Sequence, residues 1–258
     1  NFKIKLLDID DLKEFHKRHY VSEKICIAVV GNLTNDTFRN LAESDLSGIS
    51  ENTIGINKSF KNLKNKPKNI TSRKGREIVV FENLEFSRVL MAWNIPGLDD
   101  QKKIIGFEVL SSILSVGRNS KLGKVLREEK NIVESIYVDV NGGELGSLLI
   151  IEACCENKNL GLVENQINEI IYEITSHKNL TSEELKKAIN IVKSNYIFNL
   201  ETPTQISSFF GNELLWGRKN SIKNIDIFLE YWEDLSNFRE ITNFLKKDNF
   251  TLVASPRL

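Results

Sequence analysis

The sequence predicts an α/β protein of the α+β sandwich type, with a mixed, largely antiparallel sheet and helices packed on one face of it. Three observations support this prediction. Segments with helical periodicity alternate with short apolar runs, a glycine-rich turn joins two of those runs, and one helix-to-strand unit occurs twice. With 258 residues, the chain is long enough for one large domain, or for one domain and part of another.

The start of the chain predicts a helix, a strand and a second helix. A helix is expected over residues 8–20, where Asp8 can cap the first turn. The wholly apolar run 25–30 predicts a buried strand. Thr34 or Asn35 can then cap a following helix.

A basic stretch follows. Residues 58–76 contain eight lysines and arginines and no acidic residue. Runs of like charge with few apolar residues rarely pack into a core, so we interpret residues 51–76 as a solvated linker. A contact with an anionic surface is the alternative.

Residues 77–258 predict a nearly complete domain. A Pro-Gly pair ends the second strand, Asn141-Gly142-Gly143 predicts a hairpin with positive φ, and Thr181-x-x-Glu184 is a capping box. Strands are expected at 77–82, 86–95, 133–140, 146–155 and 250–254, and helices at 102–116, 120–129, 160–175, from 181 onward, 206–215 and 234–246.

An internal repeat suggests two domains. Residues 11–15 read Asp-Leu-x-x-Phe and lead through a helix into the apolar run 27–31. Residues 234–238 repeat Asp-Leu-x-x-Phe and lead into the run 251–254. We therefore interpret residues 1–50 as the tail of a first domain and 77–258 as a second one of like fold. Chance similarity between two amphipathic helices is the alternative.

Composition limits the function classes. Hydrophobic residues make up 41%, and 35 basic residues balance 35 acidic ones. The zero net charge argues against nucleic-acid binding, and no apolar run is long enough to span a membrane. Cys26, Cys154 and Cys155 suggest neither a disulfide framework nor a metal cluster. Free thiols favour a reducing compartment, so we expect a cytoplasmic protein.

Few residues are candidates for metal binding or catalysis. His16 and His19 have the spacing of two helical ligands, but no acidic or cysteine partner is near, so a packed or surface role is expected. Neither His-Glu-x-x-His nor His-x-x-Glu-His occurs. Arg127 lies near the end of a predicted helix that leads into a strand. It can complement the helix dipole, pair with Glu128, or reach a substrate carbonyl or carboxylate.

Several segments resemble the insulinase/pitrilysin-type zinc peptidases, the inverzincins, which include the mitochondrial processing peptidases and similar bacterial proteins. That family carries a run similar to Gly-Gly-x-Ser-Ser-Arg-Leu-x-x-x-Leu-Arg-Glu-x-x-Gly-Leu-x-Tyr-Ser. Here residues 120–122 read Ser-Lys-Leu, with Lys for Arg, and 126–128 read Leu-Arg-Glu. The segments 11–22, 29–32 and 91–97 also look like the family.

The resemblance implies two like halves that close around a peptide. Zinc would be bound by a His-x-x-Glu-His motif and a later Glu in the first half, upstream of Asn1, so no catalytic residue, metal ligand or cofactor is expected in this chain. The second half of the family contributes an Arg and a Tyr that hold substrate. Arg127 matches the Arg, Glu134 stands at the Tyr position, and Tyr137 lies three residues further. These three are the candidate substrate-binding residues.

Two functions from different classes follow. The first is the substrate-enclosing second half of a zinc metalloendopeptidase, provided that the intact protein carries the upstream zinc motif. The alternative is a non-catalytic peptide-binding or scaffold subunit that partners a separate catalytic chain. A purely structural module is the third interpretation. The expected partners are a peptide substrate and either the first half or a catalytic chain, and a dimer stays open.

Overall fold

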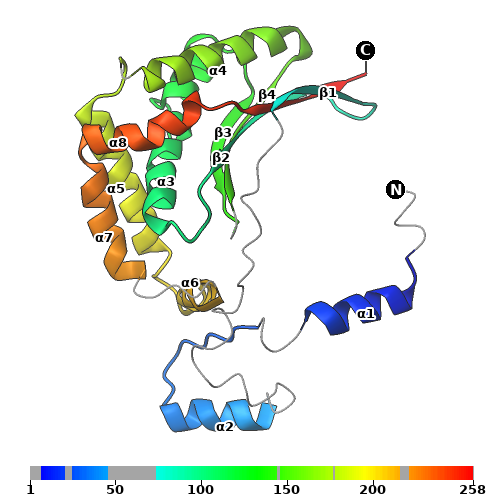
Figure 1. Cartoon of the computed structure of the whole chain (residues 1–258), viewed down its shortest axis with the longest axis vertical. Helices are drawn as coiled ribbons and strands as arrows, with labels where there is room; N and C mark the ends of the chain where they lie inside the picture. Colours follow the sequence, from blue (N-terminus) through cyan, green and yellow to red (C-terminus); the bar gives the residue numbers. More distant parts are fainter. Residues whose placement is uncertain are drawn as a thin grey trace. The chain divides into compact units, whose positions relative to one another are not determined.

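The computed structural model describes residues 7–20, 25–45, 74–143, 146–176, 178–215 and 221–257. The chain divides into two compact units, one made of residues 1–66 and 198–219 and the other of 67–197 and 220–258. The sheet belongs to the second unit (Figure 1). Within the described ranges, none of the helices combines the length and apolarity that a membrane crossing needs.

A five-stranded sheet forms the centre of the second unit. Its strands lie in the order β1-β5-β2-β4-β3. β1 runs parallel to β5, and the other neighbouring pairs are antiparallel. The predicted mixed, largely antiparallel sheet is therefore confirmed. The strands are β1 (Gly75–Phe81), β2 (Ser87–Ile95), β3 (Ser135–Asn141), β4 (Ser147–Cys155) and β5 (Phe250–Pro256).

Helices cover one face of this sheet (Figure 1). α3 contacts β3, α4 contacts β2 and β4, and α7 and α8 pack on α3. Every second residue of β2 and β4 is buried, as expected for strands with one face on the core. The helices are α3 (Gln101–Ser115), η5 (Gly123–Glu129), η6 (Asn157–Asn159), α4 (Leu160–Thr175), α5 (Ser182–Phe198), α7 (Ser221–Trp232), α8 (Leu235–Thr242) and η7 (Asn243–Lys246).

The core between these helices is aromatic and closely packed. Trp232 and Phe238 are completely buried, and the indole N–H of Trp232 donates to the Lys102 carbonyl at 2.8 Å. Gly106 lets α3 approach this cluster, since a β-carbon there would lie 2.7 Å from Ile241 Cδ1. The absence of a side chain at Gly106 therefore sets how closely α3 and α8 pack.

Local signals explain where several helices begin. The backbone N–H of Glu184 donates to the Thr181 hydroxyl, and the Glu184 carboxylate accepts from the Thr181 backbone N–H, which confirms the predicted capping box. Asp234 caps α8 by accepting from the Ser236 backbone N–H. The predicted inward stripe of α5 is buried and comprises Leu185, Ala188, Ile189 and Val192.

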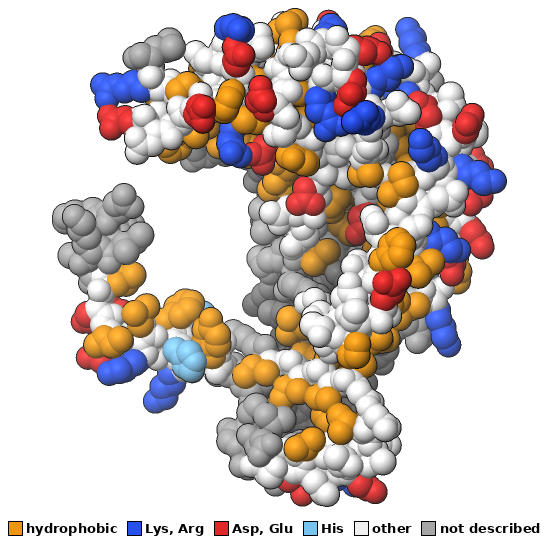
Figure 2. Space-filling model, turned by 180° about the vertical axis from the view of Figure 1, so that it is seen from behind, with side chains coloured by type: hydrophobic (Ala, Val, Ile, Leu, Met, Phe, Trp, Pro, Cys, Tyr) orange, Lys and Arg blue, Asp and Glu red, His pale blue; other side chains and the backbone are white. Residues whose placement is uncertain are grey.

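The first unit contains α1 (Ile9–His19), α2 (Asn35–Asp45) and α6 (Pro203–Leu215). Asp8 caps α1 as predicted. The apolar side chains of α1 are exposed, and Figure 2 shows them beside histidine on the helix surface. Most of the predicted linker, residues 51–73, lies outside the described residues.

Two predicted elements are corrected. Residues 25–30 do not form a strand, because the described residues supply no neighbouring strand to complete a hydrogen-bonded ladder. The helix predicted over 120–129 is mainly the π-helix η5, in which the Lys130 N–H donates to the Val125 carbonyl five residues earlier, at 3.0 Å. Leu122, just before η5, and Leu126 within it are both completely buried.

The hairpin prediction is right in topology and wrong in its turn chemistry. β3 and β4 pair antiparallel as expected, with Asn141 opposite Leu148. Neither Gly142 nor Gly143 has φ in the left-handed region. Gly142 serves a close approach instead, because a β-carbon there would lie 2.5 Å from Leu98 Cδ2.

Candidate functional site

The face of the sheet opposite the helices is the candidate site. On this open face, the outward residues of the central strands are half-buried and mostly apolar. The register brings them together from strands far apart in the sequence. A half-exposed apolar surface of this kind is typical of a binding surface. Its central members are Leu90, Ala92, Leu148, Ile150, Phe250 and Leu252.

One row crosses this face from the centre of the sheet to the β3 edge. Leu252 pairs with Leu90, Leu90 pairs with Glu152, and Glu152 pairs with Tyr137. Side chains at such paired positions lie on the same face and next to each other. Tyr137 ends the row with 65% of its surface exposed. The row therefore begins with apolar side chains, continues with a carboxylate and ends with an exposed aromatic ring.

An ion pair lies within the same surface. Arg88 Nη1 donates to Glu152 Oε1 at 2.6 Å, from β2 to β4. The hydrogen bond and the charge of Glu152 raise the pKa of Arg88, so the guanidinium stays charged. Cys154 pairs with Arg88 in the register, and burial raises the pKa of its thiol. The surface therefore carries a positive guanidinium, which is fixed by its ion pair with Glu152, beside an uncharged thiol.

Of the three predicted substrate-binding residues, Tyr137 lies on this surface and Glu134 lies near it. The exposed Glu134 precedes β3, and its backbone N–H donates to the Cys154 carbonyl at 2.8 Å. Its charge is close enough to raise the pKa of Cys154 further. Tyr137 stands opposite Glu152.

Arg127 lies on η5, and its guanidinium is partly exposed. Its Nε donates to Glu128 Oε1 at 3.0 Å, which is one of the roles predicted for it. Nη2 turns back over Gly123, 4.0 Å from where a β-carbon would stand. In the described part of the chain, no hydrogen bond or ion pair joins Arg127 to Glu134 or Tyr137. The role of the three residues in substrate binding stays a prediction.

Sequence reasoning missed Arg88 and Glu152. Neither belongs to a motif, and their partnership depends on a pairing register between distant strands. A usable signal was present, because both are charged residues within predicted strands whose alternate positions are apolar. Parity alone places them on the face away from the core.

The donor side chains do not suggest a metal site in the part of the chain described. There, no group of three or more His, Cys, Asp or Glu side chains is arranged to hold a metal ion. His16 and His19 lie exposed on α1, where His16 stacks on Tyr20 and His19 lies against Phe15. His177 lies outside the described residues. His16 and His19 therefore do not fit a zinc centre within the described residues.

Comparisons with known proteins agree with this description. The family described as Peptidase M16 inactive domain matches residues 7–192. An uncharacterized zinc protease of Streptomyces coelicolor is 23% identical over 229 residues, covering 86% of this chain and 48% of that protein. Subunit alpha-2 of the mitochondrial-processing peptidase of Dictyostelium discoideum is 24% identical over 216 residues, covering 75% of this chain and 48% of that protein.

Solved structures share the fold. A protease from Helicobacter pylori superposes with a TM-score of 0.77 at 18% identity, covering 98% of this chain and 60% of that one. A peptidase M16 inactive domain from Pseudomonas fluorescens gives a TM-score of 0.71 at 15% identity, covering 98% of this chain and 59% of that one. The chain spans about half the length of the curated relatives it matches.

Proposed function

Because the chain belongs to the peptidase M16 family, which it matches through the inactive domain, we propose that it is the substrate-enclosing second half of a zinc-dependent metalloendopeptidase. In this proposal the open sheet face forms one wall of a chamber that holds a peptide between two halves. The single observation that supports it best is the row of apolar, carboxylate and aromatic side chains that ends at the exposed Tyr137.

The chemistry of this wall suits a peptide chain. Half-buried Leu90 and Ile150 can cover apolar side chains, and Tyr137 can stack on a side chain or donate its hydroxyl to a carbonyl. Arg127 would grip a substrate carbonyl or C-terminal carboxylate once it leaves Glu128. Glu134 would meet a basic side chain. Zinc in the intact protein would be held by residues of the first half and would activate the attacking water.

The domain arrangement is part of this proposal. We assign residues 1–50 to the end of the first half, 51–76 to a linker and 77–258 to the second half. Support comes from α1 and α8, since each carries the Asp-Leu-x-x-Phe sequence in its first turns and leads into an apolar segment. Phe238 of α8 is buried, whereas Phe15 of α1 is 57% exposed. The remainder of the first half would cover that apolar face.

The test compares two tyrosines in the intact protein. Tyr137→Ala should raise the KM for a quenched fluorescent peptide by about tenfold, because it removes an aromatic contact from the wall. Tyr172→Ala is the matched control, since Tyr172 is 68% exposed but lies on α4, on the helix side. Melting temperatures should stay close to that of the parent for both variants. Equal KM values for the two variants would contradict the proposal.

A second candidate function is a non-catalytic peptide-binding or scaffold subunit beside a separate catalytic chain. The similarity to a subunit of a processing peptidase favours this candidate. A zinc chelator separates the two functions. For the first, chelation should abolish turnover by the purified intact protein while peptide binding persists. For the second, that protein should bind peptide but show no turnover even when zinc is supplied, until a catalytic chain is added.

A further inference from the structure

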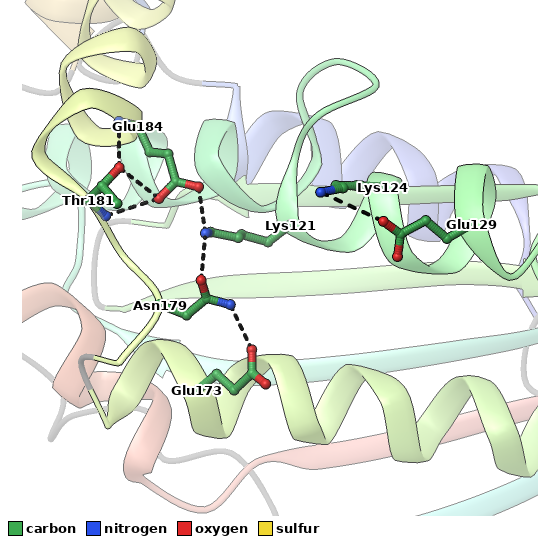
Figure 3. Close-up of polar contacts among 7 residues, drawn as sticks. All are labelled: Lys121, Lys124, Glu129, Glu173, Asn179, Thr181 and Glu184. Atoms are coloured by element: carbon green, nitrogen blue, oxygen red, sulfur yellow. Dashed lines mark hydrogen bonds and ion pairs between the residues drawn. The ribbon is translucent and has the colours of Figure 1, made fainter.

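Among the lysines and arginines that form ion pairs in the described residues, Lys121 has the least exposed side chain, with 14% of its surface accessible. Its Nζ donates to Glu184 Oε1 at 2.5 Å and to Asn179 Oδ1 at 3.4 Å. Figure 3 shows the lysine reaching from the turn just before η5 to these two partners around the beginning of α5. A partly buried charge held by two partners restrains the backbone that carries it.

Glu184 serves two elements at once. One carboxylate oxygen accepts from Lys121, and the other accepts from the backbone N–H and hydroxyl of Thr181 at 3.0 and 3.1 Å. Burial of the carboxyl opposes its charge most strongly, but the hydrogen bonds from Lys121 and Thr181 together hold the pKa of Glu184 below its ordinary value. The same network continues through Asn179 Nδ2, which donates to Glu173 Oε2 on α4 at 2.9 Å.

The segment fixed by Lys121 is the one that carries Arg127. Leu122, the residue after Lys121, is completely buried, and Gly123 follows as the first residue of η5. A β-carbon on Gly123 would lie 2.6 Å from the Ser120 hydroxyl and 4.0 Å from Arg127 Nη2. Arg127 Nη2 therefore lies near the turn at Gly123, two residues after the lysine that is tied to α5. A shift of that turn is expected to displace the guanidinium.

We propose that Lys121 is a positioning residue, whose ion pair with Glu184 holds the turn that leads into η5 and thereby sets where the Arg127 guanidinium meets the peptide. This inference rests on the proposed function, in which Arg127 grips the substrate. Arginine is the other cation long enough to reach the Glu184 carboxylate from this position.

A second lysine on the same segment supplies the control. Lys124 lies on η5 and pairs with Glu129 at 3.7 Å, with 58% and 52% of the two side chains exposed. Figure 3 shows this pair within the helix itself, pointing along η5 rather than to α5. An exposed ion pair within one helix contributes little to the position of neighbouring groups, so its loss should leave the Arg127 side chain in place.

The experiment measures KM and kcat for a quenched peptide with the intact protein. Lys121→Met should raise KM about tenfold, because a small displacement of a substrate-holding group is costly. Lys121→Arg keeps a cation opposite Glu184 and should leave KM within about twofold of the parent, and Lys124→Met should leave it unchanged. If Lys121→Met fails to fold, Glu184→Gln replaces it, since glutamine keeps an oxygen for the Thr181 cap while the ion pair is lost.

The double variant with Arg127→Ala decides between positioning and general stability. If Lys121 acts through Arg127, Lys121→Met should change KM by less than about twofold in the Arg127→Ala background. The inference would be overturned if the KM of the double variant rose by the product of the two single increases. It would also be overturned if Lys121→Met lowered the melting temperature and left KM unchanged. If Arg127→Ala itself leaves KM unchanged, the substrate role of Arg127 in the proposed function fails, and the inference fails with it.

Discussion

Gly106 of α3 permits a close approach that a single methyl group should disrupt. A β-carbon at this position would lie 2.7 Å from Cδ1 and 2.8 Å from Cγ1 of Ile241, and 3.0 Å from the Trp232 ring. Both neighbours are completely buried, so neither can move into solvent. Gly106→Ala should therefore force α3 away from α8 or push Ile241 out of its rotamer.

Two opposing effects set the size of the change. Alanine is favoured over glycine inside a helix by about 1 kcal/mol. Overpacking of a well-packed core costs about 1–3 kcal/mol, and the very short distances at Gly106 favour the upper part of that range. The net loss of stability should be about 1–2 kcal/mol. For a protein of this size, each 1 kcal/mol corresponds to about 2–4 °C in melting temperature.

The assay is urea and thermal unfolding followed by circular dichroism, with a second glycine as control. A β-carbon on Gly161 of α4 would meet nothing within 4 Å, so Gly161→Ala should be neutral or stabilising by up to about 1 kcal/mol. Ile241→Val removes the nearest methyl group, so the double variant with Gly106→Ala should be more stable than the two single losses predict. A Gly106→Ala variant as stable as Gly161→Ala would refute the packing described for α3.

Further predictions concern a thiol, a carboxyl and a cap. Burial and then the neighbouring Cys154 raise the pKa of Cys155 to about 11, so a short iodoacetamide pulse at pH 8 should label Cys154 before Cys155, as read by mass spectrometry, and equal labelling would contradict this. The Glu184 pKa is lowered on folding, because the hydrogen bonds from Lys121 and Thr181 outweigh the larger single influence of burial. Its contribution to stability is therefore present above the unfolded-state pKa and disappears as the pH falls through the folded-state pKa. Glu184→Gln should accordingly destabilise the protein in urea melts at neutral pH but not at a pH where the carboxyl is protonated, and a pH-independent difference would exclude an ionic origin. Thr181→Ala should cost about 1 kcal/mol by removing the α5 cap, whereas Thr181→Ser should not, and calorimetry of both variants tests the pair.

The elements with strong local signals could be predicted from the sequence. The Thr181 capping box and the stripe behind it located α5, whereas the Pro96-Gly97 stop located the end of β2 and the Asn141-Gly142-Gly143 turn signal placed β4 after β3. α7 was not predicted, because Ile and aromatic residues lower its helix propensity. Its buried residues Ile225, Leu229 and Trp232 nevertheless have helical spacing.

The failures have a common physical origin in tertiary context. The run 25–30 has the composition of a strand, but strand formation depends on a partner that composition does not reveal. The π-helical turn of η5 is defined by a hydrogen bond from the Lys130 N–H to the Val125 carbonyl, which the spacing of apolar residues does not reveal. Local periodicity predicted helix here without indicating its type.

The candidate site divides in the same way. The position of Tyr137 on an exposed strand face follows from alternation around Ile136 and Val138, which are both buried. The pairing of Arg88 with Glu152 does not, because it needs the register that sets Leu90 opposite Glu152. Sequence patterns thus identify faces, whereas partners across strands require the three-dimensional structure.

The π-helix also has a consequence for how the family can diversify. An extra residue within a helical turn is what a single-codon insertion leaves behind, and a single-codon deletion would return η5 to α-helical winding. Each residue of an α-helix turns about 100° around the helix axis, and each residue of the wider π-helix turns less. The winding of η5 therefore determines the direction in which Arg127 leaves the helix, and with it the direction of one cation.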